Sequence, residues 1–265
     1  MTGFTKTLKN NFIEFKESIT IKSVVKYTII VLLIAIIMIS NIYSGYFINN
    51  PFREKGIGQC YNVPILNEYI GLADVLHQNI KSQNVKDIAK NIANAVFITN
   101  ILALFILFMP YNVTNMKILL SFLIIAALAY IIRVASFSVT VPPPPHQQTE
   151  LEKKKWYDIP KIILEETNPS APLSDFMFSG HGFFIILSFL FIWYFRKINW
   201  LHFYAPKLFN ILLILMGIAS VCSLPAISIS GLHYTSDVII GVSMAILFFL
   251  SKQYFILDIN YKALV

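Results

Sequence analysis

Charged residues and cysteines are scarce in this chain of 265 residues. Only 13 % of the residues are charged, whereas 56 % are hydrophobic, and a soluble globular domain needs a more polar surface. The composition therefore excludes an ordinary soluble protein and indicates an integral membrane protein. Cys60 and Cys222 are the two cysteines. Because Cys222 lies inside an apolar run, we expect neither a disulfide between them nor a thiolate metal site.

Six apolar runs are long enough to cross a bilayer. A helix rises about 1.5 Å per residue, so about twenty apolar residues span the hydrocarbon core. The first run lacks the small-residue cleavage pattern of a signal peptide, so we expect it to be a retained span. The expected spans cover residues 24–48, 92–109, 113–136, 176–195, 206–224 and 232–250. They predict an all-α, polytopic membrane protein with six transmembrane helices and no soluble second domain.

The first twenty residues have apolar side chains at spacings of three and four, with lysines between them. The apolar positions are Phe4, Leu8, Phe12, Phe15 and Ile19. This pattern predicts an amphipathic helix that lies on the membrane surface; the alternative is a solvated helix that leads into the first span. We thus expect an amphipathic cytoplasmic segment over residues 1–23, a six-span membrane domain over 24–255 and a cytoplasmic tail over 256–265.

Basic residues are concentrated at one end of the expected spans. Lysines precede the first span, Arg196, Lys197 and Lys207 surround the turn after the fourth, and Lys252 and Lys262 follow the sixth. Short cytoplasmic segments of membrane proteins are rich in basic residues, so we expect both termini in the cytoplasm. The net charge of +7 is therefore interpreted as a sign of topology and not of a nucleic-acid partner.

His233 and Asp237 lie where polar sequence gives way to the sixth apolar run. On a helix, residues four apart share a face, so the carboxylate could hold one imidazole nitrogen while the other points outward. That arrangement makes a histidine nucleophilic or basic. Ionisable residues in a membrane span are costly and usually face a cavity or each other, which favours a functional pair. Tyr234 either lines the same pocket or belongs to an interfacial aromatic belt.

Ser179, Gly180 and His181 open the fourth apolar run. Exposed N–H groups and the helix dipole at such a start favour an anion, and Gly180 would allow the anion to approach the backbone closely. Two histidines could divide the work, because one can attack phosphorus while the other protonates the departing oxygen. A metal site is an alternative, although the residues lack a diagnostic ligand spacing.

Arg133 and Asp175 are further candidates at the same level of the membrane. Arg133 could clamp a phosphate bidentately, or it could be a residue that snorkels to the membrane edge. Asp175 could polarise His181 or bind a cationic headgroup; alternatively it is only a carboxylate near a helix start. With six spans these residues face the exoplasmic or periplasmic side together with His233 and Asp237. A transporter or scaffold would have its ionisable groups at mid-membrane, so clustering at one edge favours chemistry on a lipid headgroup.

Three segments resemble the successive signature segments of the sphingomyelin synthase family, a branch of the type 2 phosphatidic acid phosphatase superfamily. They are RVASFSVTVPP at 133–143, DFMFSGH at 175–181 and HYTSDV at 233–238, and the resemblance extends over the third to sixth spans. It implies that His233 forms a phosphohistidine intermediate, that Asp237 orients it, and that His181 protonates the leaving diacylglycerol. It implies no metal and no other cofactor.

The resemblance leads us to expect an enzyme that moves a phospho-alcohol, such as phosphocholine, from a glycerophospholipid to a lipid alcohol such as ceramide. The alternative is a lipid phosphatase or phospholipase C-like hydrolase with water as the acceptor. Related phosphatases usually have an arginine six residues before the second histidine, and Ile227 at that position favours transfer. The expected catalytic residues are His181, His233 and Asp237, and the expected substrate-binding residues are Arg133, Asp175, Ser179, Gly180 and Tyr234.

Overall fold

The computed structural model describes residues 82–109, 113–139 and 178–251, together with positions 28–29, 32–33, 36, 76 and 80. Every regular element in these ranges is a helix, so the all-α prediction is confirmed. The elements are α5 (Gln83–Leu107), α6 (Val113–Val139), α8 (Gly180–Tyr194), the 3-10 helix η3 (Arg196–Ile198), α9 (Trp200–Tyr204), α10 (Pro206–Ile229) and α11 (Thr235–Leu250).

Among the described residues, three helices are long and apolar enough to cross a membrane: α5, residues Thr114–Arg133 of α6, and α10. α8 and α11 are apolar but shorter. Most of the expected first span and the whole amphipathic segment 1–23 lie outside the described residues, as does the tail 256–265. The helices support an integral membrane protein, while the number of six spans and the orientation of the termini stay predictions.

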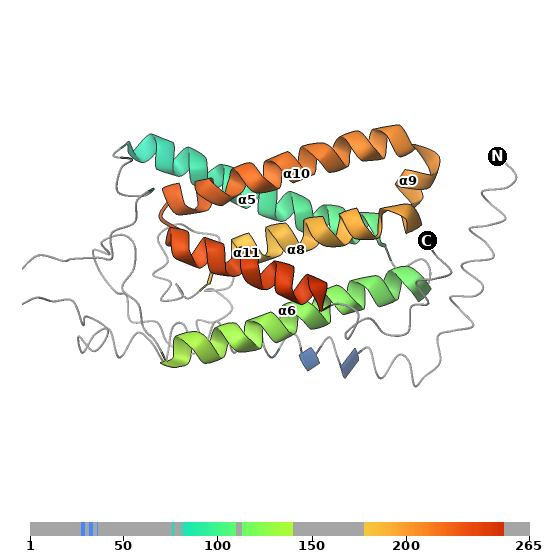
Figure 1. The fold of residues 1–265 in the computed structure, drawn as a ribbon, viewed down its shortest axis with the longest axis horizontal. Helices are drawn as coiled ribbons and strands as arrows, with labels where there is room; N and C mark the ends of the chain where they lie inside the picture. Colours follow the sequence, from blue (N-terminus) through green and yellow to red (C-terminus); the bar gives the residue numbers. More distant parts are fainter. Residues whose placement is uncertain are drawn as a thin grey trace, which may run out of the picture.

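α8 forms the centre of the helical bundle. It contacts α5 and α10 on one side and α11 and α6 on the other (Figure 1). Ten of its fifteen residues are buried, as expected for a helix that is apolar on all sides. α10 instead exposes Ile211, Ile214 and Leu215, which suits a helix facing hydrocarbon. The most apolar helix, α8, thus forms the interior of the bundle, and the outer helices supply a lipid-facing surface.

A buried asparagine ties three of these helices together. The Asn100 side-chain amide donates to Ser220 Oγ of α10 at 2.9 Å and to the Ile185 carbonyl of α8 at 3.1 Å. Ser220 Oγ in turn donates to the Met216 carbonyl at 2.7 Å. Such interhelical hydrogen bonds contribute about 0.6–2 kcal/mol each in membrane proteins. They therefore fix the mutual register of α5, α8 and α10.

α5 begins at Gln83, nine residues before the predicted start of the second span. The helix is therefore longer than the apolar run from which the second span was predicted. Lys86, Asp87 and Lys90 lower the hydropathy of this stretch, yet lysine is a good helix former. The Gln83 amide also donates to Asp87 Oδ1 one turn later, at 2.9 Å. The helix therefore extends beyond its apolar part.

α10 continues through Pro225 to Ile229, so the prediction that the fifth span ends at Leu224 is wrong. Proline removes one backbone donor, and membrane helices tolerate this where serine hydroxyls or neighbouring helices satisfy the freed groups. Ser223 Oγ donates to the Ser220 carbonyl at 2.8 Å in this turn, next to the Val221 carbonyl, which is the one that Pro225 leaves without its helical donor. α6 likewise continues beyond residue 136 to Val139. The extra turn of α10 brings the chain close to the start of α11.

Candidate active site

Of the residues singled out from the sequence, those that the structure describes gather at one end of the bundle. The starts of α5, α8 and α11 lie there with the ends of α6 and α10 (Figure 1). The opposite end holds η3 and α9, with Arg196 and Lys197 directly after α8. Fifteen helical residues at about 1.5 Å each separate the two ends by about 22 Å along α8. The basic turn and the candidate site therefore occupy opposite ends of the molecule.

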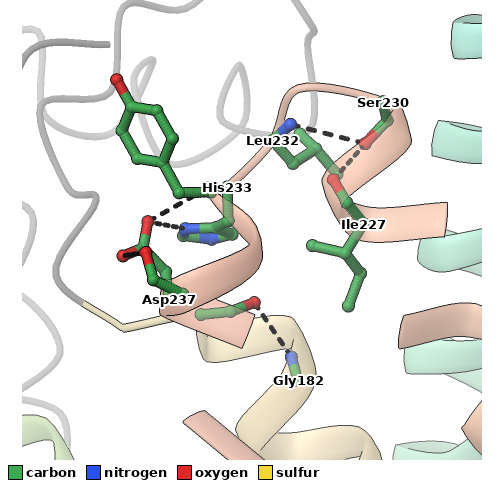
Figure 2. Close-up of polar contacts among 9 residues, drawn as sticks. Gly182, Ile227, Ser230, Leu232, His233 and Asp237 are labelled. Atoms are coloured by element: carbon green, nitrogen blue, oxygen red, sulfur yellow. Dashed lines mark hydrogen bonds and ion pairs between the residues drawn. The ribbon is translucent and has the colours of Figure 1, made fainter. Parts of the chain in front are cut away.

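His233 lies in the turn before α11 and not on the helix, which corrects the prediction that it shares a helical face with Asp237. α11 begins at Thr235 because Asp237 accepts the Tyr234 backbone N–H, through Oδ2 at 3.1 Å, and so caps the first turn. The same oxygen lies 4.0 Å from His233 Nδ1. Figure 2 shows the two side chains turned toward each other. The carboxylate thus both starts the helix and faces the imidazole.

The turn that delivers His233 is fixed by Gly231 and Ser230. Gly231 has φ 76°, a left-handed conformation that glycine adopts readily after a helix end. Ser230 Oγ donates to the Ile227 carbonyl at 2.8 Å and accepts the Leu232 N–H at 3.4 Å (Figure 2). Ile227, the position six residues before His233 that was compared with the phosphatases, is completely buried. An apolar core residue therefore occupies that position.

His181 is the second residue of α8. Ser179 caps this helix, since its Oγ accepts the Gly182 N–H at 3.1 Å. The centre of the His181 ring lies 6.4 Å from that of His233. A nucleophile about 3–3.5 Å from phosphorus and a proton donor within about 3 Å of the leaving oxygen fit two rings at this separation. The structure therefore brings both imidazoles within reach of one phosphoryl group.

Asn94 on α5 is a part of this site that the sequence did not reveal. Its Oδ1 lies 3.0 Å from His181 Nε2, and the neighbouring Phe97 ring is 4.9 Å from the His181 ring. An asparagine near the start of a long helix carries no signal of its own. Its partner is 87 residues away in the chain, so only the packing of α5 against α8 shows the pair.

Backbone contacts lock the starts of α8 and α11 together. The Ser179 N–H donates to the Asp237 carbonyl at 2.9 Å. A Cβ added to Gly241 would lie 2.6 Å from the Ser179 carbonyl oxygen, so only glycine permits this approach. Ser179 thus caps α8 and also joins the start of α8 to the start of α11. The two histidines therefore belong to segments that are directly hydrogen-bonded to each other.

Arg133 is buried, with 6 % exposure, so it is not a side chain that snorkels to the membrane edge. Its guanidinium lies over the rings of Tyr130, at 5.3 Å, and Phe178, at 5.5 Å, and Nη1 donates to Tyr130 Oη at 3.3 Å. A Cβ on Gly180 would lie 2.5 Å from Nη1. The open space at Gly180 is therefore filled by the guanidinium, which brings this cation to the start of α8.

The remaining predicted residues have different outcomes. Tyr234 is buried at 4 % exposure, which suits a pocket residue better than a membrane belt. Asp175 lies outside the described residues. In the described ranges, no three His, Cys, Asp or Glu side chains are grouped to hold a metal ion.

A comparison with protein families finds a match to the model described as PAP2 superfamily C-terminal, over residues 174–254. The match supports the type 2 phosphatidic acid phosphatase superfamily. The PAP2-matching segment contains α8 to α11, and hence His181, His233 and Asp237, whereas Arg133 precedes it. This superfamily contains lipid phosphatases and phosphotransferases, which supports an enzyme acting on membrane lipids. A comparison with curated proteins finds no match.

Proposed function

We propose that this protein is a phosphotransferase that moves a phospho-alcohol headgroup from a glycerophospholipid to a lipid alcohol. The observation that supports this most directly is the pair of imidazoles, His181 and His233, with ring centres 6.4 Å apart. The buried guanidinium of Arg133 next to Gly180 supplies a cation for the phosphate. In line with the sphingomyelin synthase resemblance, the proposed donor is phosphatidylcholine and the proposed acceptor is ceramide.

The proposed reaction has two steps. His233 attacks phosphorus, the bond between phosphorus and the diacylglycerol oxygen breaks, and His181 protonates that oxygen. The acceptor hydroxyl then attacks the phosphohistidine, gives its proton to His181 and releases His233. Asp237 holds the His233 imidazole, which gains positive charge when it is phosphorylated. The headgroup stays at the end of the bundle throughout, so both lipids can keep their chains in the membrane.

Hydrolysis by the same histidines, with water as the acceptor, is the second candidate function. It is supported by the match to a superfamily that includes phosphatases. Two observations favour transfer: the resemblance of three segments to the synthase branch, and the buried Ile227 at the position where phosphatases usually have arginine. A missing guanidinium would weaken binding of a free phosphate monoester more than that of a headgroup diester, which carries less charge.

The proposed orientation places the candidate site on the exoplasmic or periplasmic side, with both termini in the cytoplasm. It is supported by the basic residues Arg196 and Lys197, which follow α8 at the end opposite to His181. Exposed Trp193 and Trp200 flank the same turn, as expected at a membrane interface. A cysteine accessibility experiment on intact cells, with single cysteines near residues 196 and 231, would test this orientation.

The decisive experiment reconstitutes the protein in nanodiscs with choline-labelled phosphatidylcholine and ceramide. We expect label to appear on ceramide in wild type and to be lost in His181→Ala, His233→Ala and Asp237→Ala. His202→Ala is the matched control, because His202 lies on α9 at the opposite end of the bundle. Release of soluble phosphocholine or phosphate without transfer would indicate hydrolysis. Full turnover by His233→Ala would refute the mechanism.

A further inference from the structure

Asn94 contacts His181 but has no part in the two-step reaction described above. His181 Nε2 lies 3.0 Å from Asn94 Oδ1. A carbonyl oxygen can only accept a hydrogen bond, so Nε2 carries the proton in this contact. The two imidazole nitrogens occupy different edges of the ring, and the hydrogen bond made by one determines the state of the other. This contact therefore leaves Nδ1 for another group.

α5 presents Asn94 on the face that also carries Lys90 and Phe97, at helical spacings of four and three. The charged or titratable groups that face His181 are Lys90 of α5, Arg133 of α6 and His233 in the turn before α11. Within the described ranges, no carboxylate makes a hydrogen bond or an ion pair with the His181 ring. The ring is thus held by a neutral amide, with the cations Lys90 and Arg133 nearby.

We propose that Asn94 is a positioning residue that keeps the proton of His181 on Nε2, so that Nδ1 transfers the catalytic proton. This inference rests on the proposed headgroup transfer. As His233 bonds to phosphorus and the diacylglycerol oxygen departs, that oxygen takes the proton from Nδ1 of doubly protonated His181. In the second step, Nδ1 takes the hydroxyl proton of the acceptor while its oxygen bonds to phosphorus and the bond to His233 breaks. His181 retains Nε2–H throughout.

The two histidines have different partners, which suits different tasks. Asp237 brings a negative charge to within 4.0 Å of His233, and this stabilises the positive charge that develops on a phosphorylated imidazole. His181 must release and regain a proton in each cycle. A carboxylate partner would stabilise its protonated form, whereas an amide orients the ring without adding charge. The choice of asparagine therefore matches a reversible proton carrier.

The test compares Asn94→Leu with Asn94→Asp. Leucine keeps the volume but removes the acceptor, whereas aspartate keeps an acceptor oxygen and adds charge. A purely structural role for Asn94 predicts that leucine is tolerated in a membrane helix and aspartate is harmful. The positioning role predicts that leucine is the more harmful change, with kcat of Asn94→Leu lowered about 10-fold to 100-fold, the effect of one hydrogen bond to a charged group. Asn94→Asp should lose less, because it keeps the acceptor oxygen although its charge stabilises the protonated ring. KM should change little, because the proposed role of Asn94 acts on the proton of His181 and not on lipid binding.

Asn100→Leu is the matched control on the same helix. Asn100 lies six residues further along α5 and bonds to α8 and α10 away from the histidines. We expect this variant to unfold at a lower temperature than wild type but to keep wild-type kcat per folded molecule. Equal loss of kcat in Asn94→Leu and Asn100→Leu would show that α5 packing, and not the His181 contact, explains the effect.

A readout that does not need activity is the tautomer of His181, measured by NMR of protein with ¹⁵N-labelled histidine. The chain has five histidines, and His181→Gln identifies the signal. We expect the neutral ring to be protonated on Nε2 in wild type and in Asn94→Asp, and to become a mixture in Asn94→Leu. A wild-type ring protonated on Nδ1, or an unchanged tautomer in Asn94→Leu, would overturn the inference. An inactive wild type with the expected tautomer would instead refute only the proposed function.

Discussion

Replacing Gly180 by alanine provides a sharp test of the Arg133 clamp. The new Cβ would lie 2.5 Å from Arg133 Nη1 and 3.3 Å from Tyr130 Oη. Ordinary contacts need about 3.5 Å or more, so the guanidinium must move by about 1 Å. Because Nη1 ends a flexible side chain, α8 itself can stay in place. A displacement of about 1 Å at a positioned group can lower a rate by about 100-fold, or about 2.7 kcal/mol of transition-state stabilisation.

The assay measures kcat/KM for headgroup transfer in nanodiscs, with thermal unfolding recorded in parallel. Gly182→Ala is the matched control, because its added Cβ meets its nearest neighbours at 3.5 Å, an ordinary contact. We expect Gly180→Ala to lose about 100-fold while Gly182→Ala stays within a few-fold of wild type. In an Arg133→Ala background, Gly180→Ala should cause little further loss, since the two changes act on the same group. Additive losses, or full activity of Gly180→Ala alone, would refute the role of Arg133.

Three further substitutions test the frame around the site, each by thermal or denaturant unfolding in detergent and by transfer activity. Gly241→Ala places its Cβ 2.6 Å from the Ser179 carbonyl oxygen. Because this oxygen belongs to the backbone and cannot rotate away, we expect the free energy of unfolding to fall by about 1–3 kcal/mol. Unfolding like that of wild type would contradict the close approach of α8 and α11. Gly231→Ala forces a left-handed conformation (φ 76°) on alanine at a cost of about 1–2 kcal/mol, and unchanged unfolding would show that the turn relaxes. Asn100→Leu should lower stability by about 0.6–2 kcal/mol for each lost interhelical bond, whereas a more stable variant would mean that this buried amide is dispensable.

The sequence allowed the main helices and most of the candidate site to be predicted, because ionisable side chains are conspicuous at the ends of apolar runs. His181, His233, Asp237 and Arg133 were found in this way, and the structure brings them to one end of the bundle. Their proposed roles remain to be tested by the substitutions above. The limits of the helices were predicted less well, since hydropathy does not show that charged residues at the start of α5 continue a helix or that α10 passes through Pro225.

Features that depend on tertiary packing could not be predicted. Asn94 has an unremarkable place in its own helix and gains its importance only from contact with α8. Gly180 was expected to admit an anion, but α6 fills that space with a guanidinium. Asp237 was expected to share a helical face with His233, whereas its hydrogen bond to the Tyr234 N–H sets the helix start between them. In each case the deciding atom comes from the backbone or from another helix.

The hydrogen bond from the Ser179 N–H to the Asp237 carbonyl has a consequence for tolerance of different lipids. It unites the two helix starts into one backbone unit, from which His181 and His233 each stand only a few residues away. α6 contributes neither imidazole, so under the proposed function a shift of α6 that admits a longer, shorter or kinked acyl chain would leave the gap between the imidazoles unaltered. Selectivity for the hydrocarbon part of a lipid and the geometry of phosphorus chemistry would thus vary independently in this architecture.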